Sequence, residues 1–176
     1  MNVLLGVTGS VAAIYTEKLA QAFIDDGHQV RIVLTQAARQ FTTASKFATF
    51  TDELEWDWSK MGDPVQHIEL RNWMDVLLIA PLTANTMAKM VNGMCDNLLT
   101  SVWLAHGTKP VIVAPAMNTH MLMHSITQRN ICSLLTMGVG IIGPVEKKLA
   151  CGDVGIGALA PHDVIVNRTK EFACAQ

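Results

Sequence analysis

The sequence lacks two patterns that would assign it to a common class of binding protein. No GxGxxG fingerprint follows its first apolar run, which disfavours a dinucleotide such as NAD as a ligand. Its four cysteines have no CxxC spacing, which argues against a zinc site and, in a cytosolic chain, against disulfides. They are Cys95, Cys132, Cys151 and Cys174. We therefore expect no bound metal.

The chain also lacks an excess of charge and a long hydrophobic run. A net charge of -2 and a pI near 6.3 give no electrostatic reason to expect nucleic acid or an acidic membrane surface. The apolar run from Val76 to Leu82 is too short to span a bilayer. The first residues show no basic region and no cleavage-site pattern, so we expect no signal peptide and a cytoplasmic location.

What the sequence does have is a regular alternation of short apolar runs with amphipathic stretches. Half of the 176 residues are hydrophobic, which predicts a single domain over residues 1–176. The predicted strands are 2–7, 30–34, 76–80, 111–114 and 139–142, with 76–80 and 111–114 ended by prolines. The predicted helices are 11–26, 83–91 continuing from 96 to 105, 124–136 and 162–172. This alternation predicts an α/β fold with a parallel sheet covered on both faces.

Polar and small residues follow four of the predicted strands. The exits are Thr8 to Ala12, Thr35 with Gln36, Pro81 to Thr86, and Pro115 to Thr119. In parallel sheets, ligands bind beyond the carboxyl ends of the strands. Because buried polar groups need partners, these exits predict a polar, phosphate-bearing, ring-shaped ligand at that edge.

The segment from Leu149 to Ala160 carries a single cysteine, Cys151, beside Asp153, and its glycines recur at every second or third position. Three glycines in six residues are expected to prevent a stable helix or a central strand. We therefore predict a mobile loop over about 147–160 that closes over a bound ligand. On the loop alone, Cys151 is either a reactive group or a small apolar residue in a turn.

Five short motifs give the chain a resemblance to a known family. They are Gly9-Ser10-Val11-Ala12, His67-Ile68-Glu69-Leu70-Arg71, Pro81 to Thr86, Pro115-Ala116-Met117-Asn118 and Ala150-Cys151-Gly152-Asp153. Their order and spacing resemble those of the flavin-containing cysteine decarboxylases, over nearly the whole chain. The resemblance implies a flavodoxin-like (Rossmann-type) three-layer sandwich that binds FMN, and a homotrimer with active sites shared between subunits.

The resemblance also assigns roles to residues. Gly9, Ser10 and Val11 would contact FMN, Thr35 its phosphate end, Thr83, Ala84, Asn85 and Thr86 the phosphate or the ring, and Ala116 the isoalloxazine. His67 and Cys151 would be catalytic, and Asn118 and Met121 would bind the substrate. Two positions depart from the family pattern: Leu122 stands where many members have tryptophan, and no acidic residue follows Ala160.

The implied reaction is the FMN-dependent decarboxylation of 4'-phosphopantothenoylcysteine to 4'-phosphopantetheine, a step of coenzyme A biosynthesis. A carboxylate beta to a thiol has no electron sink, so the thiol carbon must first be oxidised. Two alternatives stay open at this point. One is oxidative decarboxylation of the C-terminal cysteine of a peptide, which needs no final reduction and therefore no proton from Cys151. The other is a non-catalytic FMN-binding regulatory subunit, although this chain keeps His67, Asn118 and Cys151.

Overall fold

The computed structural model describes residues 1–55, 63–150 and 152–175. Its helices and strands follow one another in the order β1 (Asn2–Val7), η1 (Val11–Tyr15, a 3-10 helix), α1 (Thr16–Asp25), β2 (Gln29–Leu34), η2 (Ala38–Gln40, also 3-10), β3 (Ala48–Phe50), α2 (Asp52–Glu55), α3 (Gln66–Trp73), β4 (Val76–Leu82), α4 (Ala84–Val91), α5 (Leu98–Leu104), β5 (Val111–Pro115), α6 (Thr119–Met123), α7 (Ser125–Thr136), β6 (Gly140–Ile141), β7 (Val145–Lys148), β8 (Val154–Ala158) and α8 (His162–Cys174). Within the described residues, no helix is long and apolar enough to cross a membrane.

Six of the strands form one parallel sheet in the order β3-β2-β1-β4-β5-β6. The predicted α/β sandwich of the flavodoxin-like (Rossmann-type) class is confirmed. After β1 the chain moves to β2 on one side, whereas after β4 it moves to β5 on the other. The carboxyl ends of β1 and β4 thus meet at the topological switch point, where ligands of such sheets bind.

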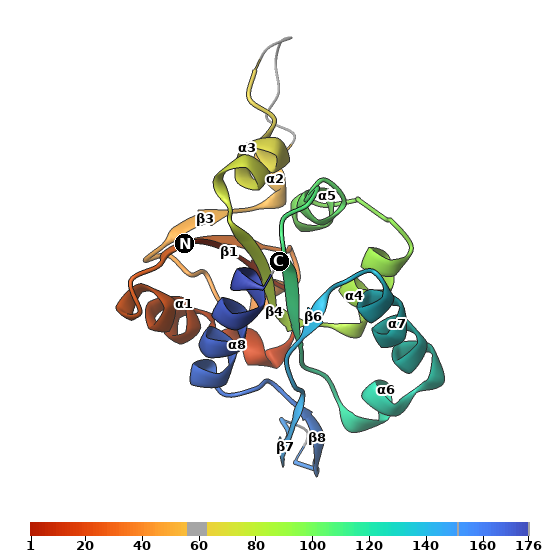
Figure 1. Cartoon of the computed structure of the whole chain (residues 1–176). Coiled ribbons are helices and arrows are strands. Elements are labelled where there is room, and N and C mark those ends of the chain that lie inside the picture. The colour runs from red at the N-terminus through yellow and green to blue at the C-terminus, as the bar shows by residue number, and fades with distance from the viewer. Residues whose placement is uncertain (56–62, 151, 176) are drawn as a thin grey trace.

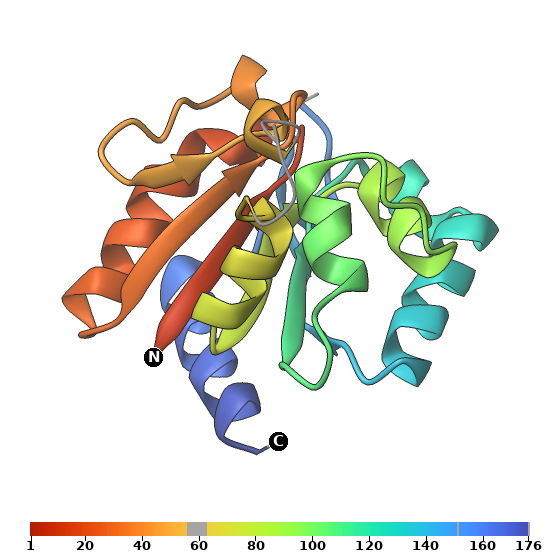
Figure 2. The same cartoon turned by 90° about the horizontal axis from the view of Figure 1, so that it is seen from above.

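Helices cover both faces of this sheet (Figures 1 and 2). Helices α1 and α8 cover one face, and α3, α4, α5 and α7 cover the other. Successive residues of β4 point to opposite faces, so that Leu78 joins the core under α1 and α8 while Leu77 joins the core under α3 and α5. Because both faces of the sheet are buried, the strands are continuous apolar runs, and such runs can be recognised in the sequence.

Several predicted boundaries are wrong. The predicted helix 11–26 is divided into η1 and α1, and strand β5 continues through Pro115. Strand β4 does not end before Pro81 but continues to Leu82, whose carbonyl accepts from Ala116 N–H at 3.0 Å. Residues 96–105 do not continue the preceding helix. Instead α4 ends at Val91, with Asn92 as its C-cap and Gly93 at a positive φ, and α5 begins after Asn97, whose side chain and backbone form a capping box with Thr100.

The segment around 147–160 is a β-hairpin rather than an irregular loop, which corrects the prediction. Strands β7 and β8 pair antiparallel, from Val145 to Lys148 and from Val154 to Ala158. Gly157 serves close packing: a Cβ there would lie 2.1 Å from the Met117 carbonyl oxygen. Met117 N–H in turn donates to the Gly157 carbonyl at 2.9 Å. The glycine thus lets β8 dock on the loop that follows β5.

Candidate active site

The exits of β1 and β4 are joined by a buried threonine. Thr8 Oγ1 donates to the Pro81 carbonyl at 2.7 Å and accepts from Thr83 N–H at 2.9 Å. Thr8 is 1% exposed, and its bond to the Pro81 carbonyl is buried. Thr8 therefore fixes the geometry of the switch point.

The other predicted residues of these exits are also held by local bonds. Ser10 Oγ donates to the Ala116 carbonyl at 3.3 Å and caps η1 by accepting from Ala12 N–H. Thr35 Oγ1 donates to the Val7 carbonyl at 3.2 Å and accepts from Ala38 N–H. A Cβ on Gly9 would lie 2.5 Å from the Ala37 Cβ, so any side chain there would push the chain after β2 away. Together these contacts draw the ends of β1, β2 and β5 into one edge.

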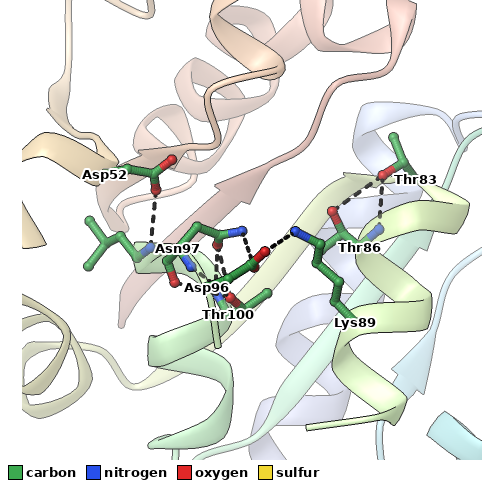
Figure 3. Close-up of polar contacts among 8 residues, drawn as sticks. Asp52, Thr83, Thr86, Lys89, Asp96, Asn97 and Thr100 are labelled. Carbon is green, nitrogen blue, oxygen red and sulfur yellow. Dashed lines mark hydrogen bonds and ion pairs between the residues drawn. The ribbon is translucent and has the colours of Figure 1, made fainter. Parts of the chain in front are cut away.

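The segment Thr83 to Thr86 opens α4, and a polar network supports it (Figure 3). Thr83 Oγ1 accepts from Thr86 N–H at 3.3 Å and so caps the helix. Farther along α4, Lys89 pairs with Asp96 at 2.5 Å, and its hydrogen bond holds the pKa of Asp96 below the usual value. The carboxylate of Asp52 accepts from Leu98 N–H at 3.1 Å, which joins α2 to the start of α5. The Thr83 cap and the bond from Thr83 N–H to Thr8 hold the N-terminus of α4 at the sheet edge, where its dipole favours an anion.

A cavity of about 900 Å³ opens beside this edge. Its walls come from η1, the loop after β5, the hairpin and the start of α8. Four predicted site residues line it, namely Ser10, Val11, Ala116 and Asn118. The Asn118 side chain caps α6 by accepting from His120 N–H at 2.8 Å, which fixes the orientation of its amide.

The other predicted residues do not line this cavity. Gly9, Thr35 and Thr83 to Thr86 lie at the strand exits next to it. Met121 is 50% exposed on α6. Half-buried His67 lies in the first turn of α3, which packs through Leu70 on the sheet face opposite the hairpin. Cys151 lies outside the described residues, and it follows Ala150, which lines the cavity.

Four cavity residues were missed from the sequence: Tyr15, Lys147, Lys148 and His162. The Tyr15 and His162 rings meet edge to face, with centroids 6.0 Å apart. Burial is the main cause that lowers the pKa of His162, and the charge of Lys18 adds to it. The two lysines lie at the start of the predicted loop over about 147–160. Their position just before Leu149-Ala150-Cys151 was the available signal.

The donor set suits an organic ligand with an anionic end. The cavity volume lies within the range of ligand pockets, and apolar side chains alternate there with hydroxyl, amide and cationic groups. Among the residues that the structure describes, no cluster of three or more His, Cys, Asp or Glu side chains could hold a metal ion.

Comparison with known proteins identifies the family. A family model described as Flavoprotein matches residues 1–174. The chain belongs to the flavoprotein family. This flavoprotein is 47% identical to a phosphopantothenoylcysteine decarboxylase of Arabidopsis thaliana, over 97% of this chain and 84% of the relative. The resemblance inferred from the short motifs is thereby confirmed.

Solved structures agree with this assignment. A cysteine-to-serine mutant of a PPC decarboxylase, complexed with pantothenoylaminoethenethiol, superposes with a TM-score of 0.93 at 46% identity, covering 97% of both chains. The FMN binding protein AtHal3 superposes with a TM-score of 0.90, also at 46% identity, covering 99% of this chain and 97% of that one.

Proposed function

We propose that this flavoprotein is an FMN-dependent decarboxylase that converts 4'-phosphopantothenoylcysteine to 4'-phosphopantetheine in coenzyme A biosynthesis. The observation that carries the proposal is the 47% identity to a phosphopantothenoylcysteine decarboxylase over nearly the whole chain. The close superposition on a PPC decarboxylase bound to an aminoethenethiol compound supports it.

The cofactor of the proposed reaction is FMN, because an FMN-binding protein shares the fold at 46% identity. Gly9, Ser10, Val11, Thr35, Thr83 to Thr86 and Ala116 would hold it at the sheet edge. When bound, FMN supplies a hydride acceptor that allows the thiol carbon of the substrate to be oxidised and later reduced again.

The residues of the chain would position the substrate and move protons. The Asn118 amide, whose oxygen is engaged by His120 N–H, would direct its nitrogen toward the substrate carboxylate. His67 would act as an acid, a base or a carboxylate-positioning group, since an imidazole ring can both donate and accept a proton. Cys151 would donate the proton that completes the reductive half of the reaction.

We further propose that the protein is a cytoplasmic homotrimer with shared active sites. His67 lies on the sheet face opposite the hairpin and does not line the cavity formed by its own chain. A neighbouring subunit would supply the His67 that completes the site beside Asn118 and Cys151. This arrangement makes assembly a requirement for turnover.

The decisive experiment is to incubate the purified protein with phosphopantothenoylcysteine and to follow the loss of carbon dioxide by mass spectrometry. We expect a product lighter by the mass of carbon dioxide, and a yellow protein whose visible absorption is that of FMN. Asn118→Ala is the matched control, expected to bind FMN but to lose most turnover. A wild-type protein that binds FMN and leaves the substrate unchanged would overturn the proposed activity.

A further inference from the structure

One wall of the cavity is basic. Lys147 and Lys148, on β7, and His162, the first residue of α8, all line it. The edge-to-face contact with Tyr15 places His162 beside η1. Two elements, β7 and α8, thus bring cationic or protonatable groups to the cavity.

These charges are not balanced by ion pairs within the described chain. The ion pairs of the described residues include neither Lys147 nor Lys148, and they do not include Lys18 of α1. The charges of Lys18 and Lys147 both lower the pKa of His162, so both act at its ring. Asp163 opposes them, with an effect smaller than that of Lys18. In a chain of net charge -2, this is a local concentration of positive charge.

We propose that Lys147, Lys148 and His162 form an anion-binding wall that holds the phosphate of the substrate. The inference rests on the proposed function and deepens it. The substrate has two anionic ends, and Asn118, on the loop after β5, is assigned to the carboxylate. Lysine ammonium groups bind phosphate as mobile point charges. Apolar Ile14 and Leu159 line the cavity as well and suit the dimethyl section of the pantothenoyl chain.

A phosphate is present on both FMN and the substrate, so the test has to separate the two. The FMN phosphate is assigned to the strand exits near Gly9, Thr35 and Thr83, which are not part of the basic wall. If the basic wall binds the substrate, the protein should still bind FMN when the charges of the wall are removed. If the wall held the cofactor instead, the protein would lose FMN when these charges are removed.

The experiment compares phosphopantothenoylcysteine with pantothenoylcysteine, which lacks the phosphate, on the FMN-loaded protein. For the wild type we expect a lower KM with the phosphorylated substrate. In Lys147→Gln/Lys148→Gln we expect the ratio of the two KM values to fall at least about 10-fold, with FMN retained and kcat for both substrates changed far less. His162→Gln should produce a smaller fall. Inorganic phosphate should compete with the phosphorylated substrate in the wild type and compete much less in the double variant.

Two variants control for loss of charge as such. Lys109→Gln removes a lysine just before β5, at the opposite edge of the sheet, and should leave the ratio unchanged. Lys147→Arg/Lys148→Arg keeps the charge and should retain most of the preference. An unchanged KM ratio in the glutamine double variant would overturn the inference, and so would loss of FMN from it. If the wild type decarboxylates neither substrate, the proposed function fails instead.

Discussion

The docking of strand β8 on the loop after β5 gives a sharp test of how the cavity wall is held. A Cβ at position 157 would lie 2.1 Å from the Met117 carbonyl oxygen, and real Cβ atoms essentially never approach closer than 3.0 Å. In Gly157→Ala, strand β8 therefore has to move outward by roughly 1 Å, because the obstacle is backbone and cannot rotate away. The 2.9 Å hydrogen bond from Met117 N–H to the Gly157 carbonyl is then lengthened or lost.

Both effects have known magnitudes. Overpacking costs about 1–3 kcal/mol, and a lost backbone hydrogen bond costs about 0.5–1.5 kcal/mol. We expect Gly157→Ala to lose about 2 kcal/mol or more, which lowers the Tm of a chain of this size by at least about 4 °C. A wall displaced by about 1 Å should also lower kcat/KM about 100-fold. Thermal denaturation followed by circular dichroism, together with the decarboxylation assay, measures both.

Gly155→Ala is the matched control, two residues earlier in the same strand. A Cβ there would lie 2.5 Å from the Thr119 hydroxyl oxygen, which is the end of a side chain that can rotate. We expect a loss below about 1.5 kcal/mol. If both variants lose the same stability, or if Gly157→Ala keeps native stability and turnover, the account of the docked hairpin is refuted.

Three further predictions concern the switch point, the shared site and pH. Thr8→Val should lose about 1 kcal/mol or more in chemical denaturation, because it leaves Thr83 N–H without its partner and leaves the Pro81 carbonyl only the 3.3 Å bond from Thr8 N–H, whereas Thr8→Ser should keep most of that stability. His67→Asn should retain FMN but lose decarboxylation by about 100-fold or more, and co-expression with an inactive Cys151→Ser chain should restore part of the activity; mixed oligomers that stay inactive would contradict the shared site. Because burial lowers the folded-state pKa of His162, the unfolded chain binds more protons as the pH falls below the usual value of 6.5, and folding stability drops in that range. His162→Gln should remove that drop, so denaturation at pH 7.5 and 5.5 should show a smaller pH effect in the variant than in the wild type.

The central strands were predictable because burial on both faces leaves an unmistakable apolar run. Strand β3 and helix α3 were missed because neither carries such a pattern. Strand β3 has three residues, none fully buried, and α3 buries Leu70 alone. The hairpin was misread because its glycines were taken as a sign of freedom, whereas Gly157 is a requirement of close contact.

The site was predictable where it follows from strand order and not where it follows from tertiary folding. The exits at Ser10, Ala116 and Asn118 lie on the cavity, as the rule for parallel sheets anticipates. Lys147 and His162 reach the same cavity only because the hairpin folds back over the loop after β5. No spacing of residues in the sequence predicts this contact between the hairpin and the loop after β5.

The hydroxyl groups at the sheet edge have a consequence for how an anion is held there. A hydroxyl owns one proton, and Thr8, Ser10 and Thr35 each donate theirs to a carbonyl oxygen of the same chain. With these bonds in place, the three side chains offer only lone pairs, which a phosphate oxygen repels. The donors for an anion at this edge are therefore main-chain amides and the side chains that open α4, such as Asn85 and Thr86, so replacing Thr8, Ser10 or Thr35 would report on the rigidity of the scaffold more than on affinity.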